Sequence, residues 1–369
     1  MNRPVVSICN PENRRAAYFR AAVAELGFPQ PVEIAWLDLL EGRVHLAELV
    51  PPRALVRIES PGENGAVEEA LVQLGQDRSR LQESRPPEHG EIGDPAAWFR
   101  GFSLLLGRVE AELGPREVSW MNHPAEIPLL FDKTACQQAL RAAGLPVPDC
   151  LGSVTSFEEL RRTLRELDVA RVFVKLRHGS SASGVVALET SNGQIKATTS
   201  VEMVNAGESL RLFNSLRVRR YTSEPEVAAL IDELCRREVH VETWVPKAGW
   251  RGATFDLRVM VIGGEVQHVV MRTSRGPITN LHLGKRRGDV AVFLAELPAE
   301  SREAAWESCS RVAAVFPRSL YFGIDLLFLP GFHRHVLLEV NAFGDLLPGV
   351  TFRGMDTYRS ELAACRSRR

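Results

Sequence analysis

Compact apolar runs alternate with helical spacing along the first third of the chain. Residues 5–9, 32–36 and 54–58 have the pattern of short strands, whereas residues 14–26 and 66–74 carry apolar positions at helical spacing. This alternation predicts a small parallel sheet flanked by helices. Because no Gly-x-Gly-x-x-Gly sequence follows the first strand, a dinucleotide site there has little support.

The pattern changes after a charged, proline-rich stretch at residues 76–94, which we expect to be a surface loop. Beyond residue 128 most of the apolar runs have strand character. The helices expected after this loop are 98–113, 132–144, 156–167 and 304–315. The expected strands are a short one in 118–124 that ends in a turn, followed by 172–175, 185–188, 239–245, 257–262, 266–271, 321–328 and 335–340.

Composition is that of an ordinary globular protein. The chain has 369 residues, 45% of them hydrophobic and 25% charged, with a formal net charge of -1. This length suits two or three packed lobes, and the near-neutral charge argues against a nucleic-acid partner. We expect no membrane segment, and the six cysteines are too scattered for a zinc site or a disulfide framework, which favours the cytoplasm.

A lysine inside an apolar strand precedes a loop of small residues. Lys175 ends the run Val172-Phe173-Val174-Lys175, and the loop of residues 179–184 reads Gly-Ser-Ser-Ala-Ser-Gly. Small residues let backbone N–H groups approach phosphate oxygens while a nearby lysine adds positive charge. A strand-end lysine beside a flexible hairpin is the alternative.

Two further apolar strands carry oxygen-bearing side chains near the end of the chain. Asp325 lies in the first, and Glu339 and Asn341 lie two positions apart in the second, so they point to one face. Hard oxygen ligands of this kind suit Mg²⁺ held jointly with phosphates, and a shared cation would offset the cost of burying carboxylates. The alternative is an acid at a sheet edge followed by an ordinary strand end.

The expected hairpin at residues 257–271 turns at Gly263-Gly264 and delivers Arg272 at the polar end of its second strand. Asn280 follows eight residues later. Taken alone, Arg272 is better explained as an ordinary surface charge.

Together these segments resemble the ATP-grasp superfamily, and within it the ribosomal-protein glutamate-ligase type. The resemblance covers about residues 122–349 and rests on the order of its pieces. These are, in chain order, Asp132-Lys133 at a helix start, Gly144-Leu145-Pro146-Val147-Pro148 at its end, Lys175 with the loop, the strand at 239–245, Asp256-Leu257-Arg258, Arg272, Asn280, Asp325, and Glu339-Val340-Asn341.

The resemblance implies an α/β ATP-grasp fold, with α+β character in the part that closes over ATP. It implies a βαβ lobe at residues 1–123, followed by two lobes at 124–238 and 239–369 that grip ATP between them. It also implies roles for matching positions: Lys133, Lys175, Gly179, Ser180, Ser181 and Gly184 at the ATP phosphates; Glu242, Trp244 and Val245 at the adenine; Arg272 and Asn280 in catalysis; and Asp325, Glu339 and Asn341 as ligands of Mg²⁺ or Mn²⁺.

The activity implied is ATP-dependent joining of a carboxylate to an amine through an acyl phosphate, with a small molecule, peptide or protein as acceptor. A homo-oligomer is one of the assembly states that the resemblance allows. A kinase on the same fold and a nucleotide-binding regulator without turnover are the alternatives. Two segments depart from the glutamate-ligase type: residues 342–345 read Ala-Phe-Gly-Asp where Ser-Pro-Gly commonly follows, and residues 280–285 read Asn-Leu-His-Leu-Gly-Lys instead of Asn-Leu-His-Arg-Gly-Gly. Both lie where the acceptor should bind, and Asp345 is either a turn residue or a ligand for the acceptor amine.

Overall fold

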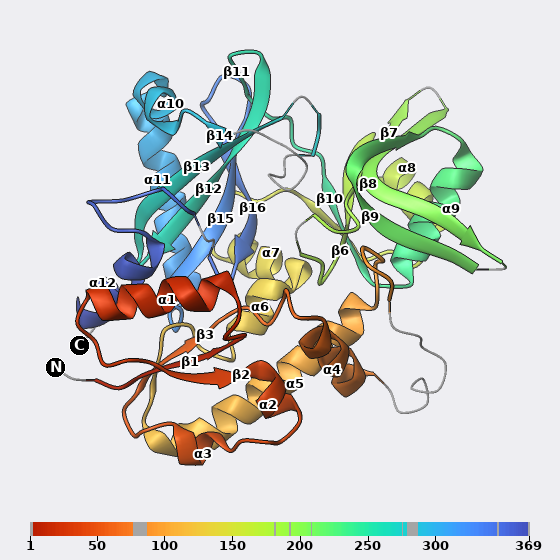
Figure 1. Cartoon of the computed structure of the whole chain (residues 1–369). Coiled ribbons are helices and arrows are strands. Elements are labelled where there is room, and N and C mark those ends of the chain that lie inside the picture. The colour runs from red at the N-terminus through yellow and green to blue at the C-terminus, as the bar shows by residue number, and fades with distance from the viewer. Residues whose placement is uncertain are drawn as a thin grey trace.

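The computed structural model describes residues 3–76, 87–180, 182–191, 193–207, 209–274, 276–278, 287–344 and 347–367. These residues form three β-sheets with helices packed around them (Figure 1). The α/β class expected from the sequence is confirmed. Within the described ranges, no helix has the length and apolar character needed to cross a bilayer.

The first sheet has the strand order β2-β1-β3-β4, and every pair in it is parallel. All five residues of β1 are buried, which explains its unbroken apolar run. The strands are β1 (Val5–Cys9), β2 (Val32–Ala35), β3 (Leu55–Ile58) and β4 (Ser119–Trp120); the helices are α1 (Arg14–Glu25), α2 (Trp36–Leu40), α3 (Leu46–Leu49), α4 (Gly65–Gly75) and α5 (Pro95–Leu113).

The second sheet is antiparallel, with the order β5-β10-β6-β7-β8-β9. Apolar residues of α8 and α9 pack on this sheet and form a core separate from the rest of the molecule. The elements are β5 (Cys150–Gly152), α8 (Phe157–Glu166), β6 (Arg171–Leu176), β7 (Val186–Ser191), β8 (Gln194–Ala206), β9 (Ser209–Tyr221), α9 (Glu224–Cys235) and β10 (Val239–Thr243).

The strand expected to open the third lobe, β10, pairs with β5 and β6 and therefore belongs to the second sheet. The chain crosses to the third sheet only after Thr243. The lobe limits at residues 123 and 238 otherwise stay a prediction.

The third sheet runs β14-β13-β12-β15-β16, again antiparallel, with β11 paired to β12. Strand β15, which lies between β12 and β16, is buried along its whole length, so Asp325 lies in a buried strand. The elements are α6 (Ile127–Phe131), α7 (Lys133–Ala142), β11 (Gly249–Trp250), β12 (Ala253–Ile262), β13 (Glu265–Ser274), β14 (Arg287–Gly288), α10 (Val290–Glu296), α11 (Ala299–Val315), β15 (Tyr321–Phe328), β16 (His335–Asn341) and α12 (Thr357–Ser367).

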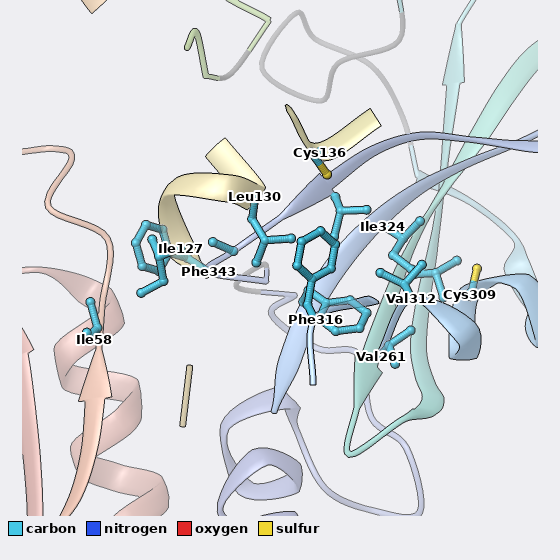
Figure 2. Close-up of a cluster of buried hydrophobic side chains, with 14 of the residues drawn as sticks. Ile58, Ile127, Leu130, Cys136, Val261, Cys309, Val312, Phe316, Ile324 and Phe343 are labelled. Carbon is cyan, nitrogen blue, oxygen red and sulfur yellow. The ribbon is translucent and has the colours of Figure 1, made fainter. Parts of the chain in front are cut away.

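The first and third sheets share one hydrophobic core. Figure 2 shows how it continues from Ile58 on β3, through Ile127 and Leu130 on α6, to Ile324 on β15 and Phe316 beyond α11. Because this core is continuous and the second sheet has its own, the N-terminal lobe and the third sheet are held together as one packed unit beside the second sheet.

Candidate functional site

A cavity of about 530 Å³ is lined by residues from all three parts of the molecule. Arg15 and Ser60 come from the N-terminal lobe, Lys175 from the second sheet, and Asp325 and Glu339 from the third. Its size is within the range of cavities that bind small molecules and cofactors.

Most of the residues predicted for the site line this cavity. They are Lys133, Lys175, Gly179, Ser180, Glu242, Val245, Arg272, Asp325, Glu339 and Asn341. Two others, Gly184 and Trp244, do not line it. Ser181, Asn280 and Asp345 lie outside the described residues.

Two lysines reach the cavity beside acidic partners. Nζ of Lys175 lies 2.5 Å from Oε1 of Glu242, and Nζ of Lys133 lies 3.0 Å from Oε1 of Glu339. Although burial alone would lower the pKa of Lys175, the carboxylates of Glu242 and Glu339 raise it above its ordinary value. Lys175 is therefore held as a cation at the wall of the cavity, and Lys133 is ion-paired with Glu339 at the same cavity.

Glu242 is buried and sits in a polar cluster behind Lys175. Its Oε2 accepts from Gln137 Nε2 at 3.4 Å and lies 3.3 Å from Nε2 of His240. Burial opposes ionisation, but Lys175 and His240 together lower the pKa of Glu242. The carboxylate is thus an anion that orients Lys175 and has hydrogen-bond partners on both oxygens.

The base of the small-residue loop (residues 179–184) is tied to the start of α7. Asp132 caps this helix by accepting from the N–H groups of Thr134 and Ala135, each at 3.0 Å, and also accepts from Arg177 Nε at 2.8 Å. Lys133 Nζ in turn donates to Gly179 O at 2.5 Å. The Asp132-Lys133 pair therefore joins the helix start to the loop.

His178 at the start of this loop stacks on Phe99, with ring centroids 3.9 Å apart. It does not line the cavity. Its ring therefore packs against α5 and does not contribute to the cavity wall.

A row of charges crosses the third sheet. In the strand register, Arg258 on β12 pairs with Asp325 on β15, which pairs with Glu339 on β16. Arg258 Nε donates to Asp325 Oδ1 at 2.6 Å, and Arg272 lies 3.0 Å from Asp325 Oδ2. Burial alone would raise the pKa of Asp325, but Arg258 and Arg272 lower it to about 2.

Arg272 is anchored from a second side. Its Nε donates to Asp256 Oδ1 at 2.6 Å, and Lys247 Nζ donates to Asp256 Oδ2 at 3.0 Å. Despite its burial, Asp325 and Asp256 raise the pKa of Arg272. Arg272 is thus a buried cation fixed between two carboxylates, which excludes the alternative of an ordinary surface charge.

The predicted metal ligands fit a cation shared with phosphates. Asp325 and Glu339 are direct cross-strand neighbours, and Asn341 lies on the same face of β16, two residues beyond Glu339. Among the described residues, no group of three or more His, Cys, Asp or Glu side chains is arranged to hold a metal. Two carboxylates and one amide would leave the remaining positions to phosphate oxygens and water, as Mg²⁺ commonly requires.

Gly184 and Trp244 make packing contacts, and their predicted contacts with ATP stay predictions. Gly184 has a φ of +65°, and a Cβ there would lie 2.5 Å from Leu176 Cδ1. The ring of Trp244 packs against Phe173, with centroids 5.2 Å apart. The loop therefore needs glycine at 184 for close packing, and Trp244 packs on Phe173, which lines the cavity.

Six charged residues of the cavity were not assigned a role from the sequence: Arg15, Glu63, Glu68, Lys247, Asp256 and Arg258. The motif Asp256-Leu257-Arg258 was part of the resemblance, so position and spacing could have singled out two of them. Arg15 and Lys247 carry no local signal, because only tertiary packing brings them to the cavity.

The structure is similar to solved structures of several ligases. The ATP-grasp ligase PsnB, in complex with a phosphomimetic variant of minimal precursor, Mg and ADP, has a TM-score of 0.55 and 17% identity over 100% of this chain and 99% of that one. The macrocyclase MdnC bound with precursor peptide MdnA from Microcystis aeruginosa MRC has a TM-score of 0.55 and 12% identity, with 98% of each chain covered. D-alanine–D-alanine ligase from Bacillus anthracis complexed with ATP has a TM-score of 0.54 and 13% identity, covering 100% and 97%.

No protein-family model matches the chain, and the comparison with curated proteins found no match. The similarity to the solved structures extends over nearly the full length of each chain, including the N-terminal lobe. The chain therefore has the ATP-grasp fold.

Proposed function

We propose that this protein is a Mg²⁺- and ATP-dependent ligase that phosphorylates a carboxylate and joins the resulting acyl phosphate to an amine, releasing ADP. The observation that carries the proposal is the composition of the cavity. The basic residues Lys133, Lys175 and Arg272 line the same cavity as the oxygen-bearing side chains of Asp325 and Glu339. Phosphoryl transfer requires this combination of positioned cations and metal ligands.

The reaction needs activation because a carboxylate oxygen is a poor leaving group at neutral pH. Transfer of the γ-phosphoryl group converts the carboxylate into a mixed anhydride that an amine can attack. Lys133 and Lys175 would bind the phosphates, and the doubly anchored Arg272 would stabilise the charge of the transferring group. Mg²⁺, held by Asp325, Glu339 and Asn341, would neutralise phosphate charge.

Acyl phosphates hydrolyse readily, so the site must exclude water during the reaction. The small-residue loop is suited to covering the nucleotide, because Gly179 and Ser180 line the cavity and Lys133 contacts the loop at Gly179. The cytoplasm remains the compartment that we expect.

The names of two similar structures support a peptide as the partner. PsnB is described with a minimal precursor and MdnC with a precursor peptide. We therefore propose that the carboxylate or the amine belongs to a peptide or protein. Asn280, His282 and Asp345, which we expected at the acceptor side, lie outside the described residues and stay predictions.

Interception of the intermediate tests the proposal. The protein is incubated with ATP, MgCl₂, hydroxylamine and a panel of amino acids, dicarboxylates and carboxylate-bearing peptides. We expect ADP and a hydroxamate in equal amounts from the parent and neither from Lys175→Met. A stable phosphorylated product without hydroxamate would favour a kinase. Nucleotide binding without ADP formation in the presence of any of the acids would favour a regulator.

A further inference from the structure

An arginine of the N-terminal lobe reaches the cavity from the first turn of α1. Nη1 of Arg15 lies 3.4 Å from Oε1 of Glu59 and 3.5 Å from the carbonyl oxygen of Phe343. Its side chain is 22% exposed and lines the cavity. Arg15 thus connects the first lobe to the turn that follows β16.

The partner that orients Arg15 is itself fixed in position. Glu59 Oε2 accepts from Arg57 Nε at 3.1 Å and from Tyr358 Oη at 3.3 Å, while Glu59 Oε1 accepts from the backbone N–H of Ser60 at 3.1 Å. A carboxylate with this many donors has little freedom to turn. It therefore gives Arg15 a defined orientation rather than the mobility of a surface side chain.

Arg57 explains why Glu59 stays in place. Its side chain is 1% exposed and also pairs with Glu361 on α12. The guanidinium lies within 5 Å of three aromatic rings, at 4.9, 4.8 and 4.6 Å from the ring centroids of Phe19, Tyr321 and Tyr358. This cluster fixes the wall from which Arg15 projects.

A second guanidinium approaches the same turn. Nη1 of Arg258 lies 3.5 Å from the carbonyl oxygen of Gly344, the residue after the one that Arg15 contacts. Arg258 also donates to Asp325, one of the proposed metal ligands. Two arginines from different lobes therefore converge on neighbouring carbonyl groups beside the edge where the metal and the γ-phosphate would lie.

We propose that Arg15 and Arg258 together bind the substrate carboxylate that receives the phosphoryl group, and that Arg15 is the contribution of the N-terminal lobe to substrate specificity. This inference rests on the proposed function. A guanidinium presents donors in a planar fork that matches a carboxylate. Because Arg15 is already oriented by Glu59, less conformational entropy is lost when the carboxylate binds.

The alternative role for Arg15 is purely structural, as a link between α1 and the turn at Phe343. The two roles predict different results. If Arg15 is a structural link, its replacement lowers the thermal stability of the protein and weakens the binding of carboxylate and nucleotide alike. A substrate-binding arginine affects the affinity for a carboxylate while nucleotide affinity stays the same.

The test is a calorimetric titration in which succinate is added to protein saturated with AMPPNP and Mg²⁺. We expect saturable binding of succinate by the parent and no binding of its neutral analogue succinamide. Arg15→Gln should weaken succinate binding about tenfold or more, since a charge-assisted contact is lost. The succinate affinity of Arg15→Lys should lie between those of the parent and Arg15→Gln, because lysine keeps the charge but not the planar fork of donors.

Arg14→Gln is the matched control, because Arg14 is the exposed neighbour on the same turn of α1 and does not line the cavity. It should bind succinate like the parent, and AMPPNP affinity should be equal in all four proteins. Equal succinate affinity in Arg15→Gln and the parent, or no binding by the parent, would overturn this inference alone. Failure of the parent to bind AMPPNP would overturn the proposed function instead.

Discussion

Replacing Gly184 by alanine should destabilise the protein through two separate effects. The residue has a φ of +65°, a conformation that costs an alanine about 1 kcal/mol. The new Cβ would also lie 2.5 Å from Cδ1 and 2.6 Å from Cγ of Leu176, and 3.3 Å from Cδ2 of Leu234. Both leucines are buried in the core of the second sheet, so they cannot move aside freely.

Overpacking of this kind costs about 1–3 kcal/mol, which brings the expected loss for Gly184→Ala to about 2–4 kcal/mol. Gly193, in the turn between β7 and β8, separates the two effects. It has a similar φ of +76°, but nothing lies within 4 Å of a Cβ at that position. Gly193→Ala should therefore cost only the conformational part, about 1 kcal/mol.

Urea unfolding of the parent and both variants, followed by circular dichroism, measures the difference through the shift in midpoint at equal slope. Equal losses in the two variants would refute the packing argument. Nucleotide binding gives a second check. If Gly184→Ala abolished ATP binding without loss of stability, Gly184 would be a binding residue, as first expected from the sequence.

Four further predictions concern the site and the buried charges. Lys175→Met should weaken ATP binding by about 1.5–3 kcal/mol in calorimetry, because a charge-assisted contact to the phosphates is lost; equal affinity would refute this. Glu339→Gln should abolish ADP formation at every Mg²⁺ concentration while leaving the circular dichroism spectrum unchanged, and full activity would move the metal site elsewhere. Arg272→Ala should lower kcat about 10³-fold with a smaller change in ATP affinity, and an unchanged kcat would make it a binding residue only. Burial, only partly offset by Arg57, raises the pKa of Glu361 from 4.5 to about 7. The folded state therefore binds this proton more tightly than the unfolded state, and the free energy of unfolding should fall as pH rises from about 4.5 through 7. Glu361→Gln should flatten that pH dependence, measured by urea unfolding at each pH.

Patterns within single segments identified most of the elements. The strands at Val5–Cys9 and Tyr321–Phe328 are buried along their whole length, so their apolar runs are continuous and easy to recognise. The long strands β8 and β9 and the helix α9 were missed. Thr199 pairs with Arg219 but Val201 pairs with Asn214, so the register between these strands shifts and interrupts the alternation that predicts a strand.

The sequence by itself also indicated which side chains share a face. Glu339 and Asn341 lie two apart in one strand, and this period alone puts them on the same side of the sheet. The order of the motifs then predicted the fold and ten of the residues that line the cavity. Such inferences succeed because they depend only on local geometry and on chain order.

Only the tertiary structure decided the partners of these groups. Arg258 meets Asp325, and Asp256 meets Arg272, because of the register in which β12 pairs with β15 and β13. Arg15 reaches the turn at Phe343, 328 positions away in the chain, because the first and third sheets share one core. Strand register and lobe packing depend on the sum of many distant contacts, so no local pattern in the sequence contains them.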